Sequence, residues 1–279
     1  MNFPFRKGPL YMAAASVCWS FGGLCIKFVP WGAMSIIGLR AAFAAVVFAI
    51  YRRSVKVELT PGNVASALFL SVTTILFVFA NKLTTAAAAI LLQFTAPAFI
   101  ILIELVVDRK KPRPGEIAAV AAVVFGIFLL FAGRLESGGF LGNLFGLASG
   151  FTFAGVFFCN RRPDVDTKQS LFLGFLINAA LGLPFALSSV SADPVPWLAV
   201  AFMGLVQVGL AYVFFSIGIR STPALLACLI SALEPLLNPI WVALAADEVP
   251  GPSALLGGLV IVSSVVIYNV RMEKRPGDP

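Results

Sequence analysis

The chain has 279 residues, of which 59% are hydrophobic and 12% are charged, and its mean hydropathy is +0.96. A soluble domain carries about a quarter charged residues and a little under half apolar ones, so this composition excludes a water-soluble protein and indicates an all-α integral membrane protein. Histidine is absent and the four cysteines are isolated, which argues against a hydrolase triad, a disulfide framework and a metal site. We therefore expect a protein that is not an enzyme and has no cofactor.

Apolar runs of about 20 residues, separated by proline, glycine and charged residues, predict ten transmembrane helices. In chain order they cover residues 10–29, 33–51, 64–80, 86–107, 116–131, 141–159, 170–187, 197–217, 223–245 and 252–270. The fourth helix contains Pro97, and the ninth contains Pro235 and Pro239. Because proline removes a backbone donor, we expect these two helices to bend near the middle of the membrane.

Small residues recur every four positions in the first and sixth predicted helices. Gly142, Gly146 and Gly150 form this pattern in the sixth helix, and 14–22 carry a similar one in the first. Such stripes let two helices approach closely, so the pattern predicts tight packing of both helices against a neighbour.

Lysine and arginine are distributed unequally between the two sides of the predicted bundle. Sixteen of the twenty lie on the side of both termini, Lys27, Lys82 and Arg134 lie on the opposite side, and Arg40 lies inside the second helix. Because basic residues accumulate in cytoplasmic loops, we expect both termini in the cytoplasm. The net charge of +7 then reflects membrane orientation, and we expect no nucleic-acid partner.

A weak internal repeat relates the two halves of the chain. When the halves are aligned so that Phe77 falls on Phe215, Pro97 falls on Pro235. We therefore expect two five-helix repeats, at 10–131 and 141–270. Because five is odd, the second repeat must be inverted, and a site between two such halves can open to one side and then to the other.

The segment from Lys82 to Pro97 resembles the end of span three and the start of span four in EamA-type members of the drug/metabolite transporter superfamily. The segment from Arg220 to Pro235 resembles its partner in the second repeat, and Trp19-Ser20 and Arg40 also fit the family pattern. The resemblance implies the drug/metabolite transporter fold and export of amino acids, metabolites or drugs across the cytoplasmic (inner) membrane. Within the superfamily it is nearest to the aromatic amino acid and methyl viologen exporter group. The first repeat departs from the family pattern, because it has Ala96 at the position where the second repeat has the family-like Glu234.

Four polar or aromatic residues of the ninth helix are predicted to share one helical face. Glu234, Asn238 and Trp241 stand at i, i+4 and i+7, and Ser231 lies one turn earlier. Such a face could bind the ammonium group and side chain of an amino acid. The alternative is that Glu234 anchors helix packing beside a proline kink. Gln93 is the counterpart of Ser231 in the first repeat, so we expect both near the pseudo-symmetry axis.

Further candidates come from other helices. Arg40 lies about 10 Å inside the second helix at 1.5 Å per residue, and it is read either as a carboxylate or Glu234 partner or as an arginine that snorkels outward. Gln207 and Tyr212 of the eighth helix add hydrogen-bonding capacity. Trp19 and Phe77 belong to a group of aromatic residues. This group either lines a cavity or consists of ordinary packing residues.

We therefore expect an inner-membrane exporter of aromatic or other apolar amino acids, or of related small metabolites, that works by alternating access. The alternatives are a non-selective drug/metabolite channel and a proton-coupled multidrug exporter, for which Glu234 is the main titratable candidate. The expected partners are a small-molecule substrate and the lipid bilayer, and the expected assembly is a monomer.

Overall fold

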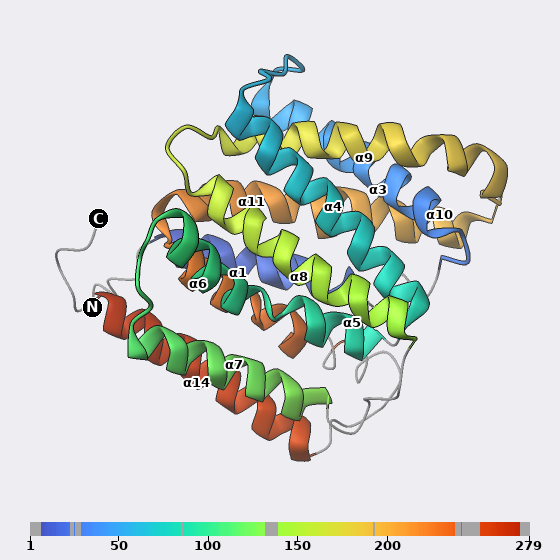
Figure 1. Ribbon diagram of the computed structural model, residues 1–279. Coiled ribbons are helices and arrows are strands. Elements are labelled where there is room, and N and C mark those ends of the chain that lie inside the picture. Colours follow the sequence, from blue (N-terminus) through green and yellow to red (C-terminus); the bar gives the residue numbers. More distant parts are fainter. Residues whose placement is uncertain are drawn as a thin grey trace, which may run out of the picture.

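The computed structural model describes residues 7–22, 25, 29–84, 86–131, 139–191, 193–237, 241 and 252–273. Every regular element in these ranges is helical, and Figure 1 shows the helices gathered in one bundle. α1 begins and α14 ends on the same side of this bundle, which we call the terminal side (Figure 1).

The first repeat contributes the helices of the first half of the chain. They are α1 (Lys7–Trp19), α3 (Ala33–Arg52), α4 (Pro61–Leu83), α5 (Ala86–Gln93), α6 (Ala96–Val107) and α7 (Pro114–Phe131). The second repeat contributes α8 (Phe140–Asn160), α9 (Thr167–Ser189), α10 (Pro194–Phe202), the π-helix η1 (Met203–Leu210), α11 (Ala211–Gly218), the 3-10 turn η2 (Ile219–Ser221), α12 (Ala224–Ser231) and α14 (Pro252–Glu273).

Six helical stretches in the described ranges are long and apolar enough to cross a membrane, and three shorter apolar helices accompany them. Together with α1, and with α5 and α6 counted as one span, they correspond to the ten predicted spans. The all-helical, ten-span fold that the sequence predicts is confirmed. The ninth span is described only for 224–237 and residue 241, so the predicted hinge Pro239 lies outside the described residues.

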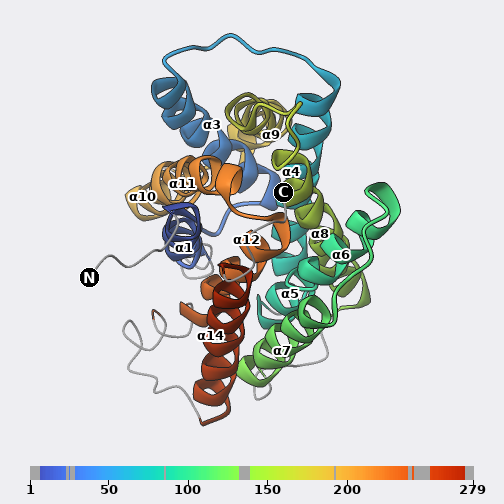
Figure 2. The ribbon, with the colours of Figure 1, turned by 90° about the vertical axis from the view of Figure 1, so that its left-hand side faces the viewer.

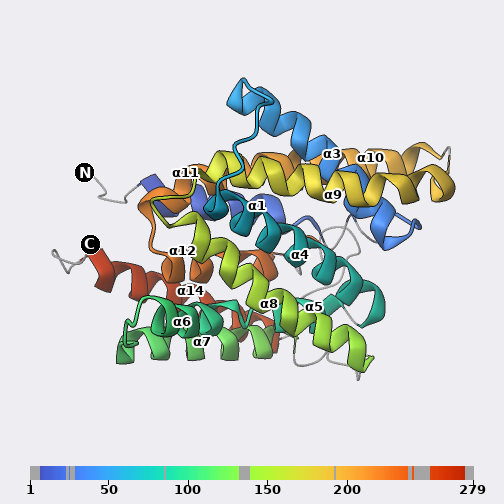
Figure 3. The same ribbon diagram turned by 45° about the horizontal axis from the view of Figure 1, so that its top comes forward.

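The helices that pack together in the bundle reflect the pseudo-symmetry that relates the two repeats. Two pairs join a helix to its own counterpart, α3 with α9 and α7 with α14, and Figures 2 and 3 show these pairs on opposite sides of the bundle. Other contacts occur twice, once in each sense of the symmetry. α4 packs on α8, and their counterparts α11 and α1 pack on each other. In the same way α4 packs on α9, and their counterparts η1 and α3 pack on each other. Because each half has five spans, an odd number, the second repeat is inverted in the membrane relative to the first.

The fourth and ninth spans are interrupted at corresponding positions. α5 ends at Gln93 and α12 ends at Ser231, its counterpart in the second repeat. The interruption in the fourth span lies before Pro97, which occupies the first turn of α6, where a missing backbone donor costs no hydrogen bond. The Thr95 hydroxyl donates to the Leu92 carbonyl oxygen at 2.6 Å and so satisfies one acceptor beside the interruption.

The glycine stripe of α8 lies against this interruption. A Cβ atom on Gly150 would stand 2.8 Å from Thr95 Oγ1 and 2.9 Å from the Gln93 carbonyl oxygen, and one on Gly146 would stand 3.1 Å from Leu92 Cβ. Any side chain at these positions would push the two helices apart. The tight packing predicted for the sixth span is therefore confirmed, and it supports the backbone beside the interruption in the fourth span.

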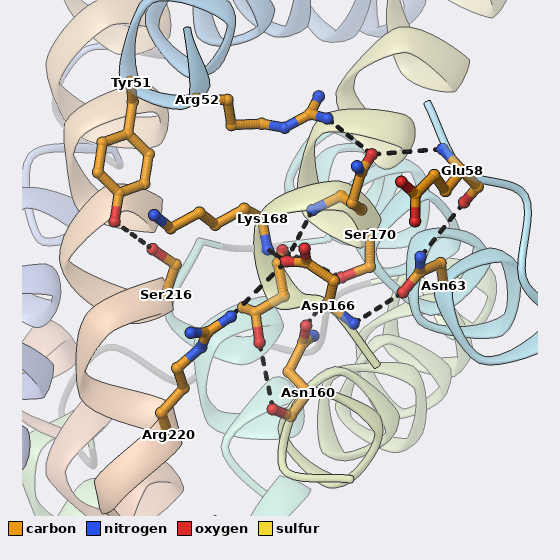
Figure 4. A network of polar contacts seen from close by, with 12 residues as sticks. Tyr51, Arg52, Glu58, Asn63, Asn160, Asp166, Lys168, Ser170, Ser216 and Arg220 are labelled. Atoms are coloured by element: carbon orange, nitrogen blue, oxygen red, sulfur yellow. Dashed lines mark hydrogen bonds and ion pairs between the residues drawn. The ribbon is translucent and has the colours of Figure 1, made fainter. Parts of the chain in front are cut away.

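Polar side chains connect four elements on the terminal side (Figure 4). Arg52 of α3 donates to Gln169 Oε1 of α9 at 2.7 Å, and Arg220 of η2 lies 3.7 Å from Asp166 at the start of α9. Deeper in the same network, Asn160 of α8 accepts from the Ser170 hydroxyl at 2.9 Å. These contacts hold the ends of α3, α8, α9 and η2 together.

Candidate functional site

A cavity between the two repeats occupies the interior of the bundle. In this conformation its cavity volume is about 70 Å³, which is below the range of roughly 300–1,000 Å³ for small-molecule sites, so the cavity must widen to hold a ligand. Seven of the ten predicted substrate-binding residues border it. They are Trp19, Arg40, Phe77, Gln93, Gln207, Tyr212 and Glu234.

Arg40 brings a buried positive charge to this cavity. Arg40 is 6% exposed, and it has no hydrogen-bond or ion-pair partner among the residues that the structure describes. This burial is inconsistent with an arginine that snorkels to the surface. Because Arg40 borders the cavity, it is available to an anionic ligand there.

Glu234 approaches the same cavity from the ninth span. It follows the interruption at Ala232, which lies between α12 and the short helical turn at 233–237. Arg40 and Glu234 form no ion pair among the contacts between described residues. The two side chains therefore border one space in this conformation without direct contact.

Gln207 reaches the cavity from the π-helix η1 in the eighth span. Its Nε2 donates to the Trp19 carbonyl oxygen at 3.4 Å, while its Oε1 has no partner within the described ranges. π-helical segments occur often at functional sites, where the wider turn changes the direction of side chains. No feature of the sequence signals this segment.

Aromatic rings form much of the cavity wall. The Trp19 ring meets Tyr212 edge to face at 5.1 Å and Phe153 at 6.2 Å between centroids, and Phe175 meets Tyr212 at 5.6 Å. Phe77 of α4 borders the cavity as well. These edge-to-face contacts fix the rings and leave an apolar surface for a hydrophobic group.

Several cavity residues were missed by sequence reasoning, and two of them carry a detectable signal. The alignment of the repeats that places Phe77 on Phe215 also places Arg40 on Asn178 and Thr74 on Tyr212, so each is the counterpart of a predicted residue. The Asn178 Oδ1 accepts from the Ser71 hydroxyl at 2.5 Å. Phe153 belongs to the same predicted aromatic group as Trp19 and Phe77, and the remaining missed residues are Ala41, Thr73, Phe175 and Val208.

Of the other predicted residues of the ninth span, Ser231 and Trp241 are not among the described residues that border the cavity. The Ser231 hydroxyl is buried and donates to the Cys228 carbonyl oxygen at 2.6 Å. The Trp241 indole donates to Ser20 Oγ at 2.7 Å and stacks on Phe21 at 4.7 Å between centroids. Asn238 lies outside the described residues. The predicted face of the ninth helix is thus divided between the cavity and the contact with the end of the first span.

Comparison with known proteins gives one family and one fold. The model of the EamA-like transporter family matches residues 6–132 and 140–270. Two proteins of Archaeoglobus fulgidus, each named an uncharacterized transporter, are similar to this chain: one is 25% identical over 72% of the chain and 73% of its own length, the other 26% identical over 75% and 76%. A solved crystal structure has a TM-score of 0.81 at 21% identity, over 95% of this chain and 98% of its own, which shows a shared fold.

Proposed function

The chain belongs to the EamA-like transporter family, and on that premise we propose that it exports amino acids with aromatic or other apolar side chains, or related small metabolites. Family membership makes it a multi-pass membrane protein that transports small molecules. The substrate class, the outward direction, the cytoplasmic (inner) membrane and the cytoplasmic termini are our proposal, and it includes no catalytic step.

The observation that carries this proposal is the buried Arg40 at the cavity, which forms no hydrogen bond or ion pair with another described residue. A guanidinium binds a carboxylate through two parallel hydrogen bonds, and such charge-assisted contacts are worth about 1.5–3 kcal/mol. A carboxylate substrate would therefore supply the partner that Arg40 lacks among the described residues. A lipophilic cation would leave Arg40 unpaired and would add a like charge.

Glu234 and the aromatic wall extend the same interpretation. A cavity that presents a guanidinium and a carboxyl group complements a zwitterion, with the substrate's ammonium group toward Glu234. The rings of Trp19, Phe77 and Phe175 then offer an apolar surface for the substrate's side chain. Gln93 and Gln207 are placed to hydrogen-bond polar groups of the ligand.

The interruptions in the fourth and ninth spans support alternating access as the mechanism. Each one places a helix end beside the cavity, at Gln93 in one repeat and shortly before Glu234 in the other. Because the repeats are inverted, an exchange of their conformations would open the cavity first to one side and then to the other. We propose that transport is driven by the substrate's own gradient.

Counterflow of labelled phenylalanine in proteoliposomes tests the proposal. We expect saturable uptake that unlabelled apolar amino acids compete for. Arg40→Lys should raise KM by about 10- to 100-fold because lysine lacks the planar fork of arginine, while Arg53→Lys at the exposed end of α3 should have no effect. Flux that does not saturate would instead indicate a channel.

The second candidate function is a proton-coupled multidrug exporter, which the acid Glu234 at the cavity favours. It predicts that lipophilic cations compete with one another, that amino acids do not, and that an imposed pH gradient drives uphill transport. Loss of that uphill transport in Glu234→Gln would support this function and refute a facilitator.

A further inference from the structure

An apolar groove lies on the outer side of α5, α6 and α7, separate from the cavity. Twelve of the described residues line it, and among these Thr95 is the only one with a hydroxyl or any stronger polar group. That hydroxyl already donates to Leu92 within the chain. The groove faces outward, since Leu102, Ile117, Phe125 and Phe128 in its walls are about half exposed. An occupant of this groove must therefore present an apolar surface to it.

The groove has the length of one leaflet of a bilayer. On α7 it extends from Ile117 to Phe128, which at 1.5 Å per residue is about 16 Å. Half of a hydrocarbon core of ~30 Å is about the same length. It begins one turn after the start of α7, beside the loop that joins α6 to α7 on the terminal side (Figures 1 and 2).

That loop carries an excess of positive charge at the mouth of the groove. It contains Arg109, Lys110, Lys111 and Arg113. Lys110 is occupied by carboxylates, at 2.7 Å from Glu104 and 3.6 Å from Glu116, and Asp108 is paired with Arg162 at 2.7 Å. Arg109 and Lys111 are exposed, and neither has a carboxylate partner in the part of the chain that the structure describes.

We propose that this groove binds one anionic phospholipid from the leaflet on the terminal side. An acyl chain lies between α6 and α7, and the headgroup phosphate meets Arg109 and Lys111. Basic pockets between transmembrane helices bind anionic headgroups in this way. The lipid would touch Leu92 and Thr95, which flank the cavity residue Gln93, so it would support the interrupted fourth span from the side opposite the cavity. This site is independent of the transported substrate.

Native mass spectrometry of protein released from nanodiscs tests the headgroup contact. The nanodiscs contain equal amounts of phosphatidylglycerol and phosphatidylcholine with identical acyl chains. We expect one phosphatidylglycerol to be retained per chain in preference to phosphatidylcholine. At about 1 kcal/mol for each basic residue, the double variant Arg109→Gln/Lys111→Gln should lower this preference about 30-fold.

A matched double variant controls for net charge. Arg53→Gln/Lys56→Gln removes two exposed charges from the loop between α3 and α4, and Arg53 shares with Arg109 a left-handed backbone, at φ 53° and 54°. It should leave the preference unchanged. An equal loss in both double variants would overturn the assignment of the headgroup to Arg109 and Lys111.

Groove-filling variants test the position of the acyl chain. Ala98 of α6 and Ala121 of α7 are exposed and line the groove, so phenylalanine at either position fills it without disturbing the core. Ala98→Phe and Ala121→Phe should each reduce phosphatidylglycerol retention. Unchanged retention in both would refute the proposal, as would equal retention of the two lipids by the unmodified protein. A dimer lost in Ala121→Phe would show that a second copy of the chain occupies the groove instead.

Discussion

Gly38 of α3 and Gly182 of α9 touch backbone to backbone where these two helices cross. A Cβ atom on either glycine would overlap main-chain atoms of the other helix. Because main-chain atoms cannot turn aside as a flexible side chain can, this crossing requires glycine at both positions. α3 and α9 are counterparts in the two repeats, so the contact joins the two halves directly.

The first prediction concerns this crossing. Gly38→Ala should lower the free energy of unfolding by roughly 1–3 kcal/mol, because overpacking at a close contact forces the helices apart. The melting temperature in detergent measures the effect. Gly115→Ala is the matched control, since a Cβ atom there meets nothing within 4 Å. Equal melting temperatures for the two variants would contradict the contact between α3 and α9.

The second prediction concerns Asn160, which joins three helices. Its Nδ2 donates to Ser66 Oγ of α4 at 2.8 Å, its Oδ1 accepts from Ser170 of α9, and its residue is 3% exposed. Asn160→Ala removes both contacts. The Ser170 hydroxyl still donates to the Thr167 carbonyl oxygen at 3.1 Å, but the buried Ser66 hydroxyl loses this partner, and a buried unsatisfied group costs about 1–3 kcal/mol. We expect a clear fall in melting temperature. Asn143→Ala, which removes one contact with Thr84, should have a smaller effect.

The third prediction concerns pH and Lys110 in the loop between α6 and α7. Burial lowers the pKa of the Lys110 ammonium, but the hydrogen bond and charge of Glu104 and the charge of Glu116 outweigh it, so this pKa lies above its ordinary value of 10.5. A raised folded-state pKa stabilises the folded protein below pH 10.5, and this stabilisation is lost as pH rises through the folded-state value.

The measurement compares melting temperatures of the unmodified protein and Lys110→Met from pH 8 upward. The difference should be constant to about pH 10.5 and should shrink above it. The Lys110 side chain is 46% exposed, so the gap should correspond to no more than about 1 kcal/mol. A gap that persists at higher pH would rule out the charge as its cause.

The sequence predicts much of the cavity for a physical reason. Polar side chains are expensive in hydrocarbon, so those retained inside spans mark either a partner or a cavity. Arg40, Gln93, Gln207 and Glu234 all border one space on this basis. The internal repeat adds a second source of information, since Asn178 is the counterpart of Arg40 in the second repeat.

The residues that sequence reasoning missed or misplaced depend on packing over long distances in the chain. Ala41 and Val208 are chemically ordinary and reach the cavity only because of how α3 and η1 pack together. Trp241 was predicted at the substrate site, but its indole bonds to Ser20, at the far end of the sequence, and no local pattern indicates that partner. Helical periodicity also assumes a continuous helix, and the interruption at Ala232 breaks that assumption.

The fourth prediction uses Asn178 to test the unpaired charge of Arg40. Asn178 of α9 borders the same cavity, and an aspartate has nearly the same shape. Asn178→Asp would place a carboxylate at a cavity that the Arg40 guanidinium also borders. Because opposite charges attract strongly where water is scarce, this aspartate should occupy Arg40 in place of a substrate carboxylate.

We expect Asn178→Asp to raise KM for carboxylate substrates at least tenfold in the counterflow assay and to leave the melting temperature equal or higher. Asn178→Leu is the comparison, because it also removes the hydrogen bond from Ser71 but adds no charge. It should lower the melting temperature and change KM less. If the two variants raised KM equally, loss of the amide would explain the effect, and Arg40 would not be the group that binds the substrate's carboxylate.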